Sequence, residues 1–182
     1  MILDEKEVLL ENGDICILRS PKEHDVDKFI EYLKVTSEET YFMGKYPEEV
    51  NMDINEQIDF ITNILESDKD ILISAFINDE LVGSTGLTCI KNHIKTKHRA
   101  TLGISIKKEY WNKGIGNILI KEALNQGVKM GYKQIELGVF SNNIKAKLLY
   151  EKNGFEVWGN IKHAFKLKDG TCYDEIIMGK FI

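Results

Sequence analysis

The chain has 182 residues, of which 43% are hydrophobic and 9% aromatic, so it can bury a substantial core and is not expected to be disordered. Lysine and arginine total 24 against 29 aspartate and glutamate residues, and the resulting formal charge of −5 argues against a general nucleic-acid binder. No repeat, proline-rich linker or low-complexity tract interrupts the sequence. We therefore expect residues 1–182 to form a single domain.

The cysteines and histidines show no metal-ligand pattern. Cys16, Cys89 and Cys172 are odd in number and form no C-x-x-C pair, so we expect reduced cysteines on strands of a cytoplasmic protein. The four histidines have no ligand spacing either, and no metal is predicted. No signal peptide precedes the first charges and no apolar run approaches the length of a membrane span, so we expect a soluble protein without membrane contact.

Two hairpins are predicted in the N-terminal half. Four segments alternate between apolar and polar residues with the two-residue period of a strand: 7–11, 14–19, 71–77 and 81–90. Asn12-Gly13 joins the first two, and an Asn-Gly pair in that position is a strong hairpin signal. Asn78-Asp79 joins the second two. The basic stretch 91–99 could touch coenzyme phosphates or an acidic partner, but a solvated hairpin tip is the interpretation that we favour.

Two segments between these hairpins show helical spacing. The first follows Pro21, with apolar residues at 26, 29, 30 and 33. The second runs to about Glu66 and opens at Asp53 and Glu56, which resemble a capping box. The loop between them, roughly 35–52, is rich in acidic and aromatic residues: Glu38, Glu39, Tyr41, Phe42, Tyr46, Glu48 and Glu49. These groups could recruit a cationic amine. We favour the alternative in which the acidic side chains are solvated and the aromatic rings pack beneath the loop.

The segment 101–117 has the pattern of a phosphate-binding turn. Residues 101–106 alternate as in a strand, and from Gly116 onward the spacing is that of an amphipathic helix. Gly114-Ile115-Gly116 opens the helix, where unpaired backbone N–H groups and the helix dipole favour an anion, and Lys113 adds a cation. A single Gly-x-Gly is weak evidence, and the further residues of a P-loop or of a dinucleotide fingerprint are missing.

A second segment, 141–155, predicts a helix whose one face could line a groove. Asn142 or Asn143 can cap its start, and Asn153-Gly154 can end it. Asn143, Ala146 and Tyr150 lie on one face at i, i+3 and i+7.

Together the two segments resemble the GCN5-related N-acetyltransferase (GNAT) superfamily, whose members transfer acetyl from acetyl-coenzyme A to an amine. The motif Asn-x-x-Ala-x-x-x-Tyr-x-x-x-Gly-Phe is met in full from Asn143 to Phe155. The motif Arg/Gln-x-x-Gly-x-Gly/Ala is met at Gly114 and Gly116, but Trp111 stands at its first position. The resemblance implies an α/β fold with a mixed, mostly antiparallel sheet of about seven strands, flanked by about four helices and splayed at the central strands.

The resemblance also implies a cofactor site. Backbone groups of Ile104 and Ile106 would hold the pantetheine arm, with one N–H polarising the acetyl carbonyl, and Gly103 would let the strand bend or bulge. The residues implied to contact acetyl-CoA are Ile104, Ser105, Ile106, Trp111, Asn112, Lys113, Gly114, Ile115, Gly116, Asn117, Asn143, Ala146 and Tyr150. Asn143 would bond the pantetheine arm, although a plain N-cap role is open.

Tyr150 is implied to be the catalytic general acid that protonates the departing thiolate. A general base is not identified, because Thr101 stands where relatives carry a glutamate, and Glu136 is a candidate by residue type alone. An acceptor that enters neutral, or a water relay to a distant carboxylate, is left open.

The sequence thus predicts an acetyl-CoA-dependent N-acetyltransferase that acts on a primary amine of a small molecule or of a protein or peptide. A non-catalytic acyl-CoA binding or sensing module of the same fold is the alternative. The partners are acetyl-CoA and an amine acceptor, and both a monomer and a homodimer are left open.

Overall fold

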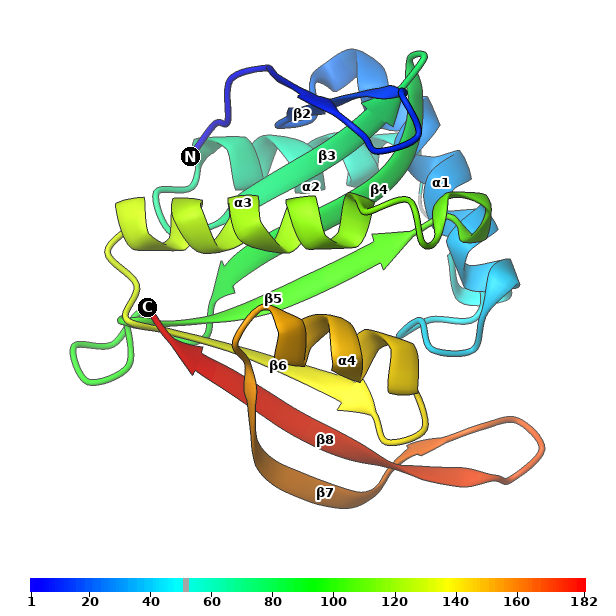
Figure 1. The fold of residues 1–182 in the computed structure, drawn as a ribbon, viewed down its shortest axis with the longest axis vertical. Helices are drawn as coiled ribbons and strands as arrows, with labels where there is room; N and C mark the ends of the chain where they lie inside the picture. The colour runs from blue at the N-terminus through cyan, green and yellow to red at the C-terminus, as the bar shows by residue number, and fades with distance from the viewer. Residues whose placement is uncertain (51–52) are drawn as a thin grey trace.

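The computed structural model describes residues 1–50 and 53–182. Its strands form one sheet in the order β1-β2-β3-β4-β5-β6-β8-β7, in which every neighbouring pair is antiparallel except β5 and β6 (Figure 1). The strands are β1 (Lys6–Leu9), β2 (Ile15–Arg19), β3 (Ile71–Ile77), β4 (Glu80–Cys89), β5 (Arg99–Ile106), β6 (Gln134–Phe140), β7 (Glu156–Lys166) and β8 (Cys172–Phe181). The mixed, mostly antiparallel sheet is confirmed, with eight strands where about seven were predicted.

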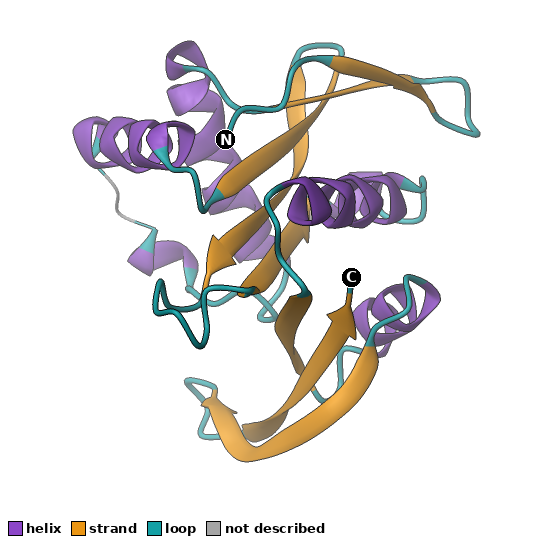
Figure 2. Ribbon diagram, turned by 90° about the vertical axis from the view of Figure 1, so that its left-hand side faces the viewer, coloured by secondary structure: helices purple, strands orange, loops and turns teal. Residues whose placement is uncertain are grey.

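Four α-helices cover the two faces of the sheet. They are α1 (Val26–Glu39), α2 (Ile54–Glu66), α3 (Ile115–Lys129) and α4 (Ile144–Lys152). Figures 1 and 2 show α3 and α4 on one face, and α1 and α2 on the other. In Figure 1 the helices α1 and α2 lie behind the strands β3 and β4, so the far face of β6, β8 and β7 carries no helix.

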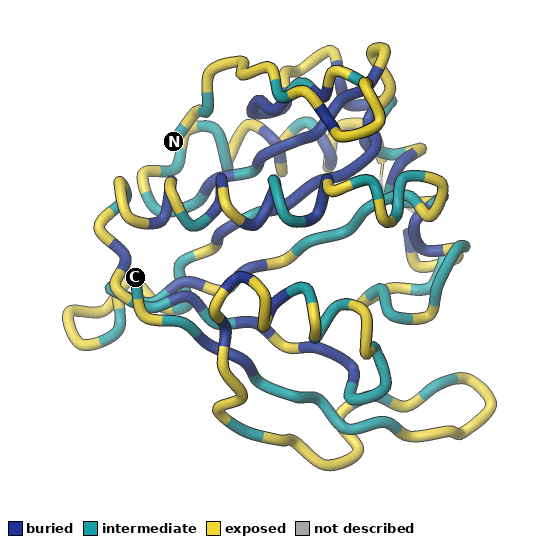
Figure 3. Tube along the Cα trace, in the orientation of Figure 1, coloured by how far each residue is buried: buried dark blue, intermediate teal, exposed yellow. Residues whose placement is uncertain are grey.

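The core has two parts. The larger part lies between the sheet and α3 with α4, and includes fully buried Leu18, Ile73, Leu119 and Ile135. The smaller part joins α1 and α2 to β3 and β4: Val26, Phe29, Tyr32, Ile61, Phe76 and Leu81. Figure 3 shows the corresponding dark-blue segments along the central strands and on the inward face of α3. Burial on both faces accounts for the nearly continuous apolar run of β3.

The parallel strands β5 and β6 are paired over a short distance. Their register runs through Arg99↔Gln134, Ala100↔Ile135 and Thr101↔Glu136, and beyond these pairs the strands diverge (Figure 1). On its other side β5 pairs with β4 without interruption, from Ala100 to Ile106. The bulge that was considered at Gly103 is therefore absent from this pairing. A wedge-shaped gap between β5 and β6 is the result, and the predicted splay is confirmed.

Local expectations were met at most element ends. Both hairpins form, and Asn78 and Asp79 take positive φ values of 49° and 65°, as a tight primed turn requires. The first hairpin has a longer loop than the Asn-Gly signal implies, because the Leu10 N–H bonds the Asp14 carbonyl at 2.9 Å.

Two expectations about the helices were wrong. The first helix continues to Glu39, so the loop predicted from residue 35 begins at residue 40. Asp53 is the N-cap of α2, but its side chain makes no capping bond and instead accepts from Asn55 Nδ2 at 3.2 Å. The end of the predicted loop, residues 51 and 52, lies outside the described residues.

The three cysteines are free and lie on strands, as expected: Cys16 on β2, Cys89 on β4 and Cys172 on β8. Within residues 1–50 and 53–182, the structure contains no helix that is both long and apolar enough to span a membrane.

Candidate active site

The turn before α3 exposes backbone donors beside the gap. Gly114 is the N-cap of α3, is exposed, and has a φ of 85°, in the left-handed region where glycine is favoured. The first helical bond runs from the Ile118 N–H to the Gly114 carbonyl at 3.2 Å, so the N–H groups before it have no acceptor inside the helix. An anion at this position would be stabilised by these donors and by the helix dipole.

The two glycines of the turn have different surroundings. A Cβ on Gly114 would meet no heavy atom within 4 Å, so a ligand can approach this backbone. Gly116 is buried, and a Cβ there would lie 2.8 Å from Leu149 Cδ2 and 3.2 Å from Ile106 Cδ1. Gly116 therefore also makes room for a side chain of α4, whereas the space beside Gly114 is open.

Trp111 ties this turn to the end of β5. Its Nε1–H donates to the Ile106 carbonyl at 2.8 Å, and the Lys145 Nζ lies 5.7 Å from the centroid of its ring. The indole thus occupies the motif position of Arg or Gln. It binds the backbone of β5 and supplies no positive charge. Lys113 Nζ lies 4.5 Å from the centroid of the Tyr110 ring, at the rim of the same turn.

The starts of α3 and α4 both carry asparagine side chains. Asn143 is the N-cap of α4, and its Oδ1 accepts from the Ala146 N–H at 3.3 Å, which confirms the capping role. In the first turn of α3, the Asn117 Oδ1 is buried and has no hydrogen-bond partner among the described residues. Exposed Asn112 completes the turn with a φ of 63°. A buried amide oxygen without a partner is a place for a polar ligand or water.

Tyr150 is a buried phenol on α4. Its side chain packs edge-to-face against Phe155 with the ring centroids 6.0 Å apart, and 7% of the residue is exposed. Burial raises the pKa of Tyr150 to about 12. Its hydroxyl makes no hydrogen bond within the described part of the chain, so the proton is available to a ligand.

The strand β5 presents different groups to the two sides of the sheet. Ile104 and Ile106 pack against the larger core, under α3 and α4, as does Ile115 from the turn. Ser105 faces the other side, where its hydroxyl lies 2.7 Å from the hydroxyl of buried Tyr32 on α1. Tyr32 was not identified from the sequence, because its spacing marks it only as a core residue of a helix.

An aromatic cluster lies at the end of β6. Phe140, at the end of β6, stacks on Phe165 with a centroid separation of 3.7 Å, and Tyr41 stacks on Tyr173 at 5.8 Å. Phe42 lies 5.5 Å from Phe140. The loop after α1 thus packs its rings against β6 and the β7–β8 hairpin, as the favoured interpretation predicted.

The glutamates of the predicted loop lie at the surface: Glu38, Glu48 and Glu49 are exposed and Glu39, at the end of α1, is half-buried, and three of the four also bind specific groups. Glu39 accepts the Lys108 N–H at 2.7 Å, and Glu49 accepts the Tyr46 N–H at 2.8 Å. Glu48 forms an ion pair with Lys168, whose N–H also donates to the Tyr46 hydroxyl at 3.0 Å. The loop is thereby fastened to the tip of the β7–β8 hairpin.

Glu136 is not a free carboxylate. It accepts from Arg99 Nη2 at 2.8 Å and from Gln134 Nε2 at 2.7 Å. The Arg99 bonds are the largest cause of a pKa that lies below the usual value for glutamate. This pairing fits a structural charge on the sheet surface better than a general base.

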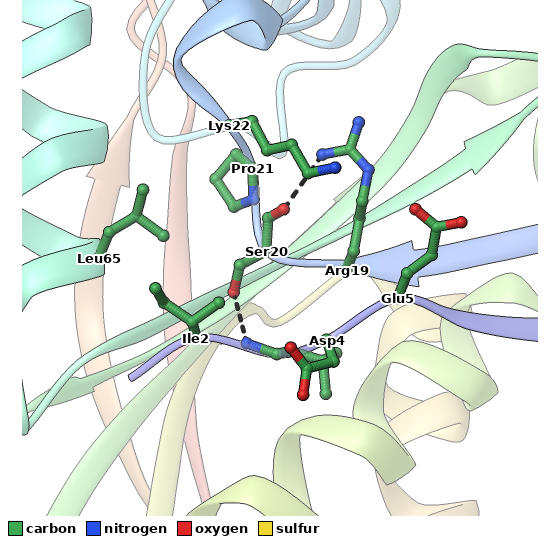
Figure 4. A pocket seen from close by; sticks show the side chains of 9 residues that line it. Ile2, Asp4, Glu5, Arg19, Ser20, Pro21, Lys22 and Leu65 are labelled. Carbon is green, nitrogen blue, oxygen red and sulfur yellow. Dashed lines mark hydrogen bonds between the residues drawn. The ribbon is translucent and has the colours of Figure 1, made fainter.

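Two open cavities lie at the surface of the described residues. One, of about 420 Å³, lies beside the N-terminal segment (Figure 4), where the Arg19 guanidinium is bound by Asp25 at 2.6 and 2.9 Å. The other, of about 450 Å³, lies where β5 and β6 part, on the face opposite α3 and α4. It is lined by Thr88, Cys89, Ile90, Thr101, Glu136, Leu137, Gly138, Glu175 and Ile177. The second cavity borders the gap, whereas the first is remote from it.

This geometry agrees with comparisons to known proteins. A family model described as the acetyltransferase (GNAT) family matches residues 27–155. The chain belongs to this family. As an N-acetyltransferase by class it is an enzyme, but the amine that it acetylates does not follow from family membership.

Similar proteins extend over most of the chain. An acetyltransferase of the GNAT family from Streptococcus pneumoniae has a TM-score of 0.88 and 28% identity, over 92% of this chain and 99% of that one. The uncharacterized N-acetyltransferase YvbK of Bacillus subtilis is 28% identical over 146 residues, which are 74% of this chain and 88% of YvbK. A phosphinothricin acetyltransferase (Pat) of Sinorhizobium meliloti, in complex with acetyl-CoA, shares the fold with a TM-score of 0.80 and 17% identity, over 92% and 88% of the two chains. Among curated relatives, the matched share of the relative's own length ranges from 49% to 88%.

Proposed function

We propose that this acetyltransferase moves an acetyl group from acetyl-CoA, bound in the gap between β5 and β6, to a primary amine of a small molecule or of a peptide. One observation carries the proposal. Gly114 at the start of α3 presents exposed backbone donors, and the hydroxyl of Tyr150 on α4 makes no hydrogen bond within residues 1–50 and 53–182; the first group suits a phosphate and the second a departing thiolate. The complex of the S. meliloti relative with acetyl-CoA supports the same co-substrate.

The residues present fit such a co-substrate. The N–H groups of the Gly114–Asn117 turn would bind its pyrophosphate, with Lys113 at the rim. The edge of β5 at Ile104 and Ile106, unpaired toward β6, would bind the pantetheine arm in the manner of a strand, because that part of β5 has lost its parallel neighbour. A backbone N–H of this edge would polarise the thioester carbonyl, and Tyr150 would protonate the leaving sulfur.

The acceptor would enter from the opposite face. The 450 Å³ cavity there falls within the usual range of small-molecule sites. The loop that follows α1 borders the same face, and its attachment to the β7–β8 hairpin through Lys168 narrows the approach. This favours a small amine or the end of a peptide over an amine on a flat protein surface.

The first test is thermal stability with and without acetyl-CoA, followed by thiol release with polyamines, aminoglycosides, amino acids and peptides as acceptors. A ligand at 100 times its Kd stabilises by about 2.7 kcal/mol, which is a readily measured shift in Tm. Stabilisation together with amine-dependent thiol release is expected. No stabilisation would reject the co-substrate, and stabilisation without release on any amine would reject the transfer.

Two glycines allow a matched control. Gly114 and Gly131 both have positive φ, 85° and 81°, and neither would place a Cβ within 4 Å of another atom, but they lie at opposite ends of α3. Gly114→Glu and Gly131→Glu should therefore carry similar backbone strain, of about 1–2 kcal/mol. Only Gly114→Glu puts negative charge at the proposed phosphate site, so only this variant should lose the acetyl-CoA shift. Equal acetyl-CoA affinity of the two variants would place the phosphate site elsewhere.

A further inference from the structure

We propose that Glu175 is the general base of the transfer reaction and receives the proton of the entering ammonium group. The inference rests on the proposed function, because it concerns the acceptor side of the same site. Glu175 lies on β8, opposite Phe140 of β6 in the register, and lines the 450 Å³ cavity where β5 and β6 part.

A glycine on the neighbouring strand places this carboxylate in the cavity. A Cβ on Gly138 would collide with Glu175 Oε1 and would lie 2.8 Å from its Cδ. The carboxylate therefore lies directly over the backbone of Gly138, two residues beyond the last β5–β6 pair, Thr101↔Glu136. Any other residue at 138 would fill the space that the carboxylate occupies.

Glu175 differs from the other carboxylate of the cavity in its partners. The Glu136 carboxylate is bound by Arg99 and Gln134, whereas the Glu175 carboxylate makes no hydrogen bond or ion pair to any residue within 1–50 and 53–182. The remaining titratable group of the lining is Cys89 on β4. The neighbouring cation Arg99 is engaged by Glu136, so an entering ammonium would find its counter-charge on Glu175.

The base and the acid then lie on opposite sides of the gap. Leu137 and Val139 of β6 belong to the core that also contains Tyr150, so the alternating positions 136 and 138 face the other side of the sheet. Glu175 lies over Gly138 on that other side. A thioester in the gap would thus meet Tyr150 from one face and the amine, with Glu175, from the other.

The protons and electrons of the step balance. Glu175 takes one proton from the ammonium, and the freed lone pair of nitrogen forms the C–N bond to the thioester carbonyl carbon. The C–S bond breaks and its electron pair leaves with sulfur, which receives a proton from Tyr150. The second proton lost by nitrogen returns to the tyrosine oxygen through solvent, and the proton on Glu175 passes to solvent. The products are an amide, a free thiol and one released proton.

The decisive variant is Glu175→Gln, which keeps the shape of the side chain and removes its basicity. With an amine that the wild-type protein acetylates, we expect kcat/KM at pH 7 to fall by about 10²-fold or more, within the range for positioned bases. The deficit should shrink as the pH approaches the pKa of the amine, because a neutral amine needs no base. Acetyl-CoA should stabilise the variant as it stabilises the wild type, and Glu156→Gln, an exposed glutamate on β7, should behave as wild type.

Gly138→Ala is an independent perturbation that moves the carboxylate without removing it, and it should lower kcat/KM in the same direction. A Glu175→Gln protein that binds acetyl-CoA and retains wild-type kcat/KM at pH 7 would overturn the inference while leaving the transferase function intact. A deficit that is constant with pH would overturn it too, since it would indicate a structural effect. A wild-type protein that releases no thiol with any amine would overturn the proposed function, and this inference with it.

Discussion

Replacing Tyr150 with phenylalanine separates catalysis from stability. The hydroxyl makes no hydrogen bond within the described residues, so its removal costs no bond, and we expect the free energy of unfolding to change by less than about 0.5 kcal/mol. If Tyr150 protonates the leaving sulfur, kcat should fall at least about tenfold, equivalent to roughly 1.4 kcal/mol in the barrier. Because burial raises its pKa to about 12, the wild-type hydroxyl stays protonated at neutral pH and can serve as an acid.

Tyr132→Phe is the matched control. Tyr132 is also buried, but its hydroxyl donates to the Lys69 carbonyl, far along the chain from Tyr150. Its loss should lower stability by about 0.5–1.5 kcal/mol and leave kcat unchanged. Chemical unfolding and steady-state thiol release on the three proteins give both quantities. An unchanged kcat in Tyr150→Phe would remove this residue from the mechanism, and a large loss of stability there would refute the reasoning about the unbonded hydroxyl.

The remaining predictions concern two anchoring contacts. Asp25→Asn should destabilise the protein by about 3 kcal/mol in urea unfolding, because it leaves buried Arg19 without its counter-charge, whereas exposed Asp14→Asn should cost less than about 0.5 kcal/mol. Burial raises the pKa of Asp25, but the bonds from Arg19 outweigh it and the net pKa is lowered. The stability that Asp25 contributes is thus fully present above its unfolded pKa and is lost as the pH falls from there through the lower folded pKa. Stability independent of pH in this range would contradict the pairing. Trp111→Phe keeps an aromatic ring but removes the N–H that bonds the Ile106 carbonyl, so Tm should fall by about 2–4 °C. An unchanged Tm would show that the indole N–H is not an anchor.

Features that depend on neighbouring residues along the chain could be predicted from the sequence. The caps of α4 at Asn143 and Asn153, the turn at Asn78-Asp79 and the helical stop at Gly154, with a φ of 83°, each follow from local backbone chemistry. The splay of the sheet could be predicted only from the family resemblance of the two motifs. The sequence of one strand does not show which strand pairs with it or where that pairing ends.

Features that depend on packing could not be predicted. Gly116 looked like a residue that admits a ligand, whereas its missing Cβ makes room for Leu149 of a helix that begins 28 residues later. Glu175 carries no sequence signal, since only the strand order β5-β6-β8 brings it to the gap over Gly138. The capping box at Asp53 was wrong because a side chain two residues away, Asn55, competes for the carboxylate.

The early end of the β5–β6 pairing has a consequence for aggregation. Past Thr101 and Glu136, each strand presents unpaired N–H and C=O groups, as the outer edge of a sheet does. Outer edges invite pairing with another chain, but these two edges face each other in the middle of the sheet, with α3 and α4 on either side of the divergence (Figure 1). A foreign β-strand would have to enter between two strands of the same sheet to pair with either of them. The unpaired backbone groups are thus less open to other chains than those of an outer edge.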